Sequence, residues 1–316
     1  WHVHRPQNRL PKSRKIHSRR NRPAANNSVA KLRYTGLMNF LDSLLSRLTM
    51  YRLMLYYLIV LVIASLFFSG FNPLNILTQS FFLLLTCFLA NQLFSKIFKV
   101  PTNFESFAIT ALILTLIIGP VPLLSSSLPF LLTLAVLAMA SKYLLVINRR
   151  HIFNPAAFAV TITAIFLNQG ASWWIGNQAM LPFLILGGLI ILRKIRRFTL
   201  ALVFLLITTV LSTSLPNFLS PSLIFFASVM LIEPFTSPIF TKFQIAYAIL
   251  VASLFKFFPL ELSLLIGNIF CYLSSPTSRF RLQLKHKLQL TSDTFAFYFS
   301  PRILLYINQN GFSMLL

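Results

Sequence analysis

The chain has 316 residues, of which 56% are hydrophobic, 10% are charged and 33 are phenylalanine. A water-soluble domain of this length would carry roughly a quarter charged residues, so the composition excludes an ordinary soluble enzyme. The formal net charge of +23 reflects 28 Lys and Arg against 5 Asp and Glu. The sequence therefore predicts an all-α polytopic membrane protein whose basic residues lie in its loops and tails.

The N-terminal part precedes the apolar region. Residues 1–36 are rich in Lys and Arg and contain no acidic residue, which predicts a disordered cytoplasmic tail attracted to anionic membrane lipids. RNA binding by this tail is the alternative, although no nucleic-acid partner is expected for the chain. Residues 37–49 are predicted to form an amphipathic interfacial helix, because Leu37, Phe40, Leu41, Leu44, Leu45 and Leu48 follow helical spacing.

Residues 50–275 are predicted to form a ten-helix membrane domain. Its apolar runs approach the length needed to cross a bilayer, and Pro-bounded short runs are tolerated when other helices surround them. Because an odd number of helices inverts the second half, two inverted five-helix halves with a site between them are also expected. The candidate spans are 50–69, 75–95, 105–121, 127–147, 155–169, 179–193, 198–214, 221–233, 243–256 and 260–275.

The basic residues between these spans lie in every second connection. Every second connection is free of Lys and Arg, apart from Lys256 near 256–260. By the positive-inside rule, the connections that carry Lys or Arg are predicted to lie in the cytoplasm, together with both termini. The predicted location is thus a cell membrane, crossed several times. The remaining connections carry Lys96, Lys99, Arg149, Arg150, Arg193, Lys194, Arg196, Arg197 and Lys242.

Metal and haem sites are not predicted. Cys87 and Cys271 lie inside separate spans, where buried thiols usually serve packing. The 5 histidines all lie outside the spans, which excludes a transmembrane haem with two histidine ligands.

Ionisable residues in or beside spans are the first candidates for function in a bilayer. Glu105 follows Asn103 and is typical of a capped helix start. Lys142 is expected to extend toward the cytoplasmic interface, and Glu261 to be an exposed residue at an outer helix start. No chain of buried carboxylates is present, so a proton-pumping relay is not expected.

Glu233 differs from these residues because it ends a span in the segment MLIEPFTSP, residues 230–238. Prolines interrupt the helix there and free backbone carbonyls beside Glu233, Thr236 and Ser237. This pattern predicts a cytoplasm-facing polar pocket that could hold a cation or a ring amide. A plain helix end followed by turn residues is the alternative.

A second candidate lies in the turn at residues 148–158. Asn154 is a favourable helix N-cap and Pro155 suits the first helical position. With Arg149 and Arg150, this helix start offers a site for a phosphate or another anion. If the two halves are inverted repeats, this site and Glu233 should meet near the centre of the bundle.

Three stretches carry a resemblance to a known family: NFESFAITALILTLIIGP at 103–120, HIFNPAAF at 151–158 and MLIEPFTSP at 230–238. In order and spacing they resemble the related flavin-carrying membrane subunits of Rnf electron-transport complexes and of sodium-pumping NADH:quinone reductases, over about residues 50–275. The resemblance implies a ten-helix fold with inverted halves that carries flavin, FMN or FAD, in an ion-coupled electron pathway.

Two departures from that family matter. It attaches FMN covalently to a Thr in a Ser-x-Ala-Thr motif after the Asn-Pro helix, whereas residues 168–176 here read NQGASWWIG. Covalent flavin is therefore not expected, and any flavin should be non-covalent. Trp173 and Trp174 are expected to anchor a helix at the interface. Glu233 also stands where relatives usually have Asp.

The C-terminal region changes character. Apolar and polar residues alternate over 280–290, and 294–299 could pair with them, which predicts a short β-hairpin. Residues 279–316 resemble the incomplete start of a ferredoxin reductase-type FAD-binding barrel, without its later flavin motif and nucleotide-binding half.

The function expected from these features is the membrane module of a flavin-dependent electron-transfer system of the NAD(P)H oxidoreductase type. Its partners would be membrane lipids and a cytoplasmic FAD/NAD(P)H reductase domain or other redox subunits, and this chain alone should lack complete reductase activity. The alternative is a channel or transporter for a small polar solute or Na⁺ without redox activity. The missing Thr motif favours the alternative, and the reductase-like hairpin favours the redox module.

Overall fold

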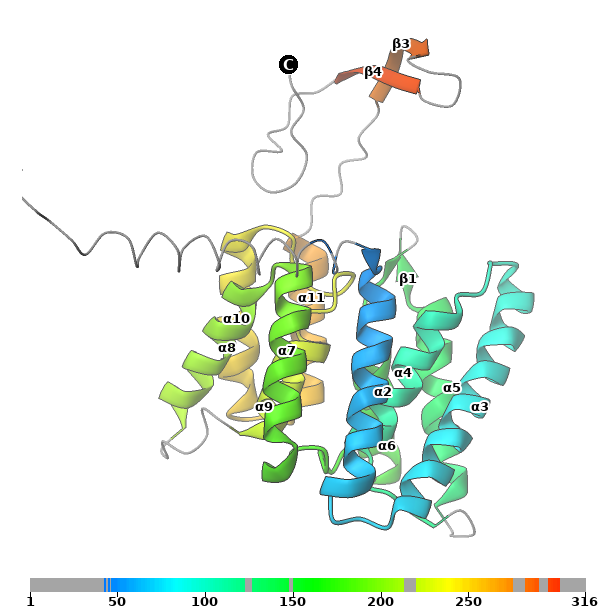
Figure 1. The fold of residues 1–316 in the computed structure, drawn as a ribbon, viewed down its shortest axis with the longest axis vertical. Helices are drawn as coiled ribbons and strands as arrows, with labels where there is room; N and C mark the ends of the chain where they lie inside the picture. Colours follow the sequence, from blue (N-terminus) through cyan, green and yellow to red (C-terminus); the bar gives the residue numbers. More distant parts are fainter. Residues whose placement is uncertain are drawn as a thin grey trace, which may run out of the picture.

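The computed structural model describes residues 43, 45, 47–122, 127–147, 150–212 and 220–274, and the backbone of 282–289 and 295–301. The described residues are mostly helical, with two small two-stranded sheets (Figure 1). This confirms the helical fold class. The tail at 1–36, most of the predicted interfacial helix at 37–49 and the candidate Arg149 lie outside the described residues.

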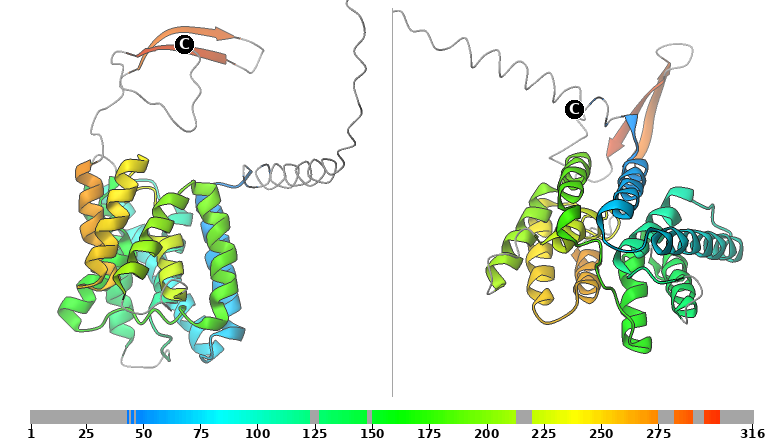
Figure 2. Two further views of the ribbon diagram at one scale, coloured as in Figure 1. Left: turned by 90° about the vertical axis from the view of Figure 1, so that its left-hand side faces the viewer. Right: turned by 60° about the horizontal axis from the view of Figure 1, so that its bottom comes forward.

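The helices follow the predicted apolar runs closely, and successive helices run in alternating directions through the bundle (Figures 1 and 2). In the first part of the chain they are α2 (Met50–Phe68), α3 (Pro73–Phe98), α4 (Phe104–Ile117), α5 (Leu128–Leu144) and α6 (Pro155–Leu167). In the second part they are η1 (Gln178–Met180), α7 (Leu181–Ile195), α8 (Phe198–Leu211), α9 (Pro221–Phe225), the π-helical turn η3 (Phe226–Met230), α10 (Thr241–Phe255) and α11 (Leu260–Ser274).

Asparagine caps explain where several helices begin. The side chains of Asn72, Asn103 and Asn154 each accept a hydrogen bond from a backbone N–H in the following first turn. Pro73 and Pro155 then occupy the first helical position, where a missing N–H costs nothing. The predicted start at Asn154–Pro155 is therefore confirmed.

The same helix pairings recur in the two parts of the chain. In the first part α2 packs on α4, α3 on α5, and α5 on α6; in the second, α7 packs on α9, α8 on α10, and α10 on α11. The α2–α7 and α6–α11 contacts join the two parts. Several equivalent helices therefore have equivalent neighbours, although α3 packs closely on α4 whereas its counterpart α8 contacts the α9–η3 segment only lightly.

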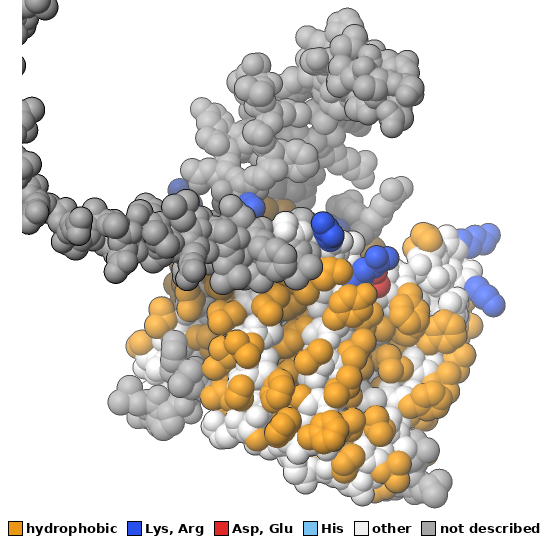
Figure 3. Space-filling model, viewed as in Figure 1, with side chains coloured by type: hydrophobic (Ala, Val, Ile, Leu, Met, Phe, Trp, Pro, Cys, Tyr) orange, Lys and Arg blue, Asp and Glu red, His pale blue; other side chains and the backbone are white. Residues whose placement is uncertain are grey.

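The surface of the bundle is strongly apolar. Three helical segments are long and apolar enough to cross a membrane: Met50–Phe68, Pro73–Phe98 and Gln178–Ile195. Large hydrophobic side chains on the flanks are widely exposed, including Phe67 at 77% and Val210 at 77% (Figure 3). A contiguous apolar surface of this kind indicates contact with lipid rather than water.

Apart from Lys256, the basic side chains of the described residues lie near one end of the bundle, part of which Figure 3 shows as a blue edge. We call this the basic end; it contains the start of α2 and the ends of α3, α5 and α7. At the opposite end, Lys256 follows α10. The residues of the basic end include Arg47, Arg52, Lys96, Lys99, Arg150, Arg193, Lys194, Arg196, Arg197 and Lys242.

Two antiparallel ladders complete the described structure. Strands β1 (Val146–Ile147) and β2 (Arg150–His151) pair between α5 and α6 and fix the approach to Asn154. Strands β3 (Leu282–Gln289) and β4 (Phe295–Pro301) pair with an irregularity between Leu284 and His286. The predicted C-terminal hairpin is confirmed.

A close approach of α2 and α7 depends on Gly187. A Cβ atom at this position would lie 2.0 Å from Cε2 of Tyr57, a buried residue whose hydroxyl donates to the Leu184 carbonyl oxygen at 3.2 Å. We expect Gly187→Ala to lower the free energy of unfolding by about 1–3 kcal/mol through overpacking. Thermal melting in detergent measures this.

Gly170→Ala is the matched control. A Cβ at Gly170 would meet Cβ of Ala164 at 3.5 Å, an ordinary contact distance. Equal melting temperatures for the two variants would contradict the close α2–α7 approach.

Candidate functional site

A cavity of about 60 Å³ lies at the basic end of the bundle. We call it the basic-end cavity. Its polar walls come from helix ends that are distant in the sequence. Apolar residues of α2, α4, α6, α7 and η3 complete the lining. The polar or backbone-breaking residues that line it are Tyr51, Ser106, Thr110, Lys142, Asn154, Pro155, Glu233 and Pro234.

The three stretches that carry the family resemblance converge on this cavity. The first contributes Ser106, the second Asn154 and Pro155, and the third Glu233 and Pro234. Because α4, α6 and η3 all end or begin at the basic end, their polar ends meet there. Segments that are distant in the sequence thus build one small site.

The chain turns sharply where Glu233 is presented. The π-helical turn η3 ends with a bond from the Leu231 N–H to the Phe226 carbonyl at 3.0 Å, and Pro234 cannot continue the helical ladder. The N–H groups of Thr236 and Ser237 both donate to the Glu233 carbonyl. π-Helical turns are frequent at functional sites, and this one places the Glu233 side chain at the cavity.

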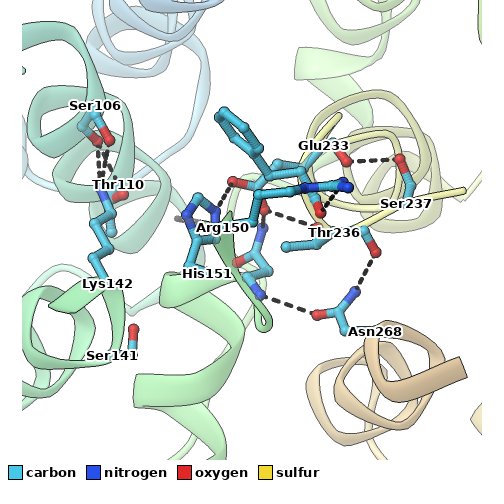
Figure 4. Close-up of polar contacts among 12 residues, drawn as sticks. Ser106, Thr110, Ser141, Lys142, Arg150, His151, Glu233, Thr236, Ser237 and Asn268 are labelled. Atoms are coloured by element: carbon cyan, nitrogen blue, oxygen red, sulfur yellow. Dashed lines mark hydrogen bonds and ion pairs between the residues drawn. The ribbon is translucent and has the colours of Figure 1, made fainter. Parts of the chain in front are cut away.

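The Glu233 carboxylate is held by three side chains (Figure 4). Asn154 Nδ2 donates to Oε2 at 2.9 Å and Thr236 Oγ1 donates to the same oxygen at 3.0 Å. His151 Nε2 lies 3.1 Å from Oε1. A carboxylate only accepts hydrogen bonds, so these contacts place the proton of His151 on Nε2 and stabilise the ionised form of Glu233.

Asn154 joins Glu233 to the start of α6. Its Oδ1 accepts from the Ala157 N–H at 3.0 Å while its Nδ2 binds Glu233. The Glu233 carboxylate therefore lies beside this helix start, and binding of an external anion there stays a prediction. An external phosphate is not needed to explain the geometry.

Asn268 of α11 completes the network from the other side. Its Oδ1 accepts from the Asn154 N–H at 3.0 Å, and its Nδ2 donates to the Thr236 carbonyl at 3.0 Å and to the Tyr247 hydroxyl at 3.1 Å. Asn268 and Tyr247 are 1% and 0% exposed. One amide thus fixes α6, the turn after η3 and α10 relative to one another.

The remaining predicted residues support the turn rather than face the cavity. Arg150 Nη2 donates to the Phe235 carbonyl at 3.0 Å, and its guanidinium lies 6.0 Å from the centre of the Phe235 ring. Ser237 Oγ donates to the Glu233 carbonyl at 2.6 Å and accepts from Arg197 Nη1 at 3.0 Å. Their binding roles remain predictions.

Lys142 corrects an expectation from the sequence. Instead of extending to the interface, its Nζ donates to the carbonyl and hydroxyl oxygens of Ser106, at 2.7 and 2.9 Å, and lines the cavity (Figure 4). The start of α4 places these two acceptors within hydrogen-bonding distance of the ammonium group, which explains why the side chain turns inward. The cavity therefore has a carboxylate and an ammonium group in its walls.

Glu261 and the two tryptophans give further corrections. Glu261 is 5% exposed rather than an exposed helix start, and its Oε1 accepts from Trp173 Nε1 at 2.8 Å. Trp174 is 7% exposed and donates to the Thr115 carbonyl at 2.8 Å. Both indoles turn inward because these buried acceptors satisfy their N–H groups, so they are not interface anchors.

His151, Tyr247 and Asn268 belong to the network but are missing from the sequence-based candidates. The sequence places His151 only outside the spans, although this residue shares the turn with Arg150 and Asn154. Asn268 is an amide within an apolar helix, and a polar residue at such a position signals an interhelical hydrogen bond. Both signals are present in the sequence.

A flavin does not fit the basic-end cavity. Sites for ligands of that size occupy roughly 300–1,000 Å³, against about 60 Å³ here. Glu233 already accepts three hydrogen bonds, and Arg150 is bound to a backbone carbonyl. The cavity can hold water molecules or a similarly small polar species.

Comparison with known proteins does not assign the chain: no protein-family model matches it, and no curated protein is significantly similar to it.

Proposed function

We propose that this chain is the ion-coupling membrane module of a flavin-dependent electron-transfer system, with the basic-end cavity as its coupling site. The observation that carries the proposal is the convergence of all three family-like stretches on that one cavity. Residues that served only helix capping would have no reason to meet. The coupling itself would use the facing charges of Glu233 and Lys142, which a small cation, a proton or a water molecule can rearrange.

The architecture supports a site between two related halves. The recurring helix pairings are those expected for two inverted five-helix repeats, and transporters of that type place their sites at the repeat interface on broken helices. The turn from η3 into Pro234 is such a break. We therefore propose ten spans, with the basic end and both termini in the cytoplasm.

The flavin of this system would lie outside the basic-end cavity. The C-terminal hairpin β3–β4 supports a reductase-type flavin domain or a partner subunit on the cytoplasmic side. When bound, the flavin supplies the redox chemistry, and this chain contributes position and electrostatics.

The flavin content of the purified chain tests the proposal. We expect the full chain, isolated together with its partner subunits from its native membrane in a mild detergent, to carry flavin that acid releases and that NAD(P)H reduces. Because the covalent motif is absent, no fluorescent band should remain on the polypeptide after denaturation. A preparation without flavin, or with flavin that NAD(P)H cannot reduce, would overturn the redox assignment.

The orientation can be tested by cysteine labelling in intact cells. Gln169, which follows α6 at the opposite end, and Lys99, at the basic end, are both exposed. In a background where Cys87 and Cys271 are replaced by alanine, Gln169→Cys should react with an impermeant reagent from outside. Lys99→Cys should react only after the membrane is opened. The reverse pattern would contradict the proposed topology.

A second candidate function is a channel or transporter for a small polar solute. The small volume of the cavity favours it, because water-sized species fit where a flavin does not. Proteoliposomes containing the chain would then show faster permeation of water or ammonia, lowered by Lys142→Met. If the chain did not change the permeation of water or ammonia and carried flavin that NAD(P)H reduces, the channel function would be excluded and the redox module would remain.

A further inference from the structure

A larger cavity of about 500 Å³ lies at the opposite end of the bundle, remote from Glu233. We call it the opposite-end cavity. It is bounded by the start of α11, the middle of α6, the segment before η1 and the start of α9. Its walls are mainly apolar, and its polar lining residues are Thr161, Ser220, Ser222 and Glu261, with the indole of Trp173.

Glu261 brings a carboxylate into this apolar surrounding. It lies in the first turn of α11, where the helix dipole favours a negative charge. Its side chain accepts from the neutral Trp173 indole N–H, and no described Lys, Arg or His lies within ion-pair distance of it. A buried carboxylate without a cation is costly, so the site is favourable for a cationic ligand.

Thr161 supplies an independent observation. Its side chain is 7% exposed and lines the cavity, and its Oγ1 has no hydrogen-bond partner among the described residues. Threonines in these helices normally bond a carbonyl of the preceding turn, as Thr163 does to Val160 at 3.1 Å. An unpaired buried hydroxyl carries a desolvation cost, and rotation of the side chain would bring Oγ1, which is shielded in the structure, into the cavity where a ligand recovers that cost.

The walls restrict the class of cation. A bare inorganic ion needs several oxygen ligands at short range, whereas most lining residues here are aliphatic or aromatic. The Trp173 ring is fixed by edge contacts with Phe225 and Phe226, at centroid distances of 6.3 and 5.9 Å. A fixed indole beside a carboxylate suits an organic ammonium group through cation–π attraction. A phosphorylated flavin would add negative charge beside Glu261.

We propose that the opposite-end cavity binds a small alkylammonium cation, with Glu261 as its counter-ion, Trp173 as an aromatic wall and Thr161 as a hydrogen-bonding contact. The ammonium group belongs either to a free amine or to the headgroup of a membrane lipid, which present the same chemistry. This site is independent of the function proposed for the basic-end cavity.

Choline binding to the delipidated full chain in detergent tests the proposal, measured by calorimetry and by thermal stabilisation. Wild type should bind choline. The uncharged carbon isostere of choline should bind at least about tenfold more weakly. Glu261→Gln keeps an acceptor for Trp173 but removes the charge, so it should melt near wild type and weaken choline binding about tenfold or more.

Thr161→Val is the second variant, because removing an unpartnered hydroxyl should leave folding intact. It should weaken choline binding by roughly three- to tenfold through the lost contact with the choline hydroxyl, because the quaternary ammonium group has no N–H to donate. Retention of phosphatidylethanolamine by wild type but not by Glu261→Gln in native mass spectrometry would identify a lipid as the source of the ammonium group. No binding of either choline or this lipid, equal binding of the isostere, or undiminished binding by Glu261→Gln would overturn the proposal.

Discussion

Glu233→Ala is expected to lower the free energy of unfolding by about 2–4 kcal/mol. The Glu233 side chain is 24% exposed and accepts from His151, Asn154 and Thr236. Alanine would leave these three donors around an empty space at the basic-end cavity. Thermal and denaturant unfolding in detergent measure the loss.

Glu105→Ala is the matched control for this variant. Glu105 also stands at the basic end, but its partner Arg52 is 59% exposed and the pair is surface-accessible. Removing such a pair should cost roughly 0–1 kcal/mol. If both variants lost the same stability, the Glu233 network would have no special role in the fold.

Asn268→Leu is expected to cost about 3–5 kcal/mol, because it leaves the buried Asn154 N–H and Thr236 carbonyl without partners. Leucine fills a similar volume, so lost hydrogen bonds rather than a cavity should dominate the effect. Ile269→Leu, at a neighbouring residue that is 45% exposed, should change stability by less than about 0.5 kcal/mol.

Glu233 and Asn268 should also be energetically coupled. Asn268 acts on Glu233 through Asn154, so a Glu233→Ala and Asn268→Leu double variant should lose clearly less stability than the sum of the single losses. Strictly additive losses would contradict one connected network.

Much of the helical framework could be predicted because hydrophobic length and cap residues act locally. Asn154 and Pro155 fix the start of α6 whatever surrounds them, and the alternation over residues 280–290 fixes the hairpin. Glu233 could also be singled out, since a carboxylate before Pro234 at the end of an apolar run is conspicuous in one sequence.

The partners of these residues could not be predicted because they depend on the tertiary arrangement. The sequence predicts Lys142 at the interface, and only the position of the α4 start explains its contact with Ser106. It predicts an exposed Glu261, and only the inward turn of Trp173 explains the burial of this residue. Long polar side chains reach several ångströms in any direction, so sequence spacing alone does not decide their partners.

The size of the basic-end cavity could not be predicted from the sequence either. Arg150, Asn154, Glu233 and Thr236 present the right chemistry for a flavin, yet they bond to one another and to the backbone around a small space. The same residue types can line a cofactor pocket or close it, and packing decides between these outcomes.

The most direct test of the proposed coupling site is the membrane potential formed by NAD(P)H in vesicles from the native membrane. Wild-type vesicles should oxidise NAD(P)H and develop a potential, as should vesicles with Glu105→Gln. Glu233→Gln, which retains the size of the side chain but not its charge, should lower the potential about tenfold or abolish it. A wild-type potential in the Glu233→Gln vesicles would contradict the assignment of the basic-end cavity as the coupling site.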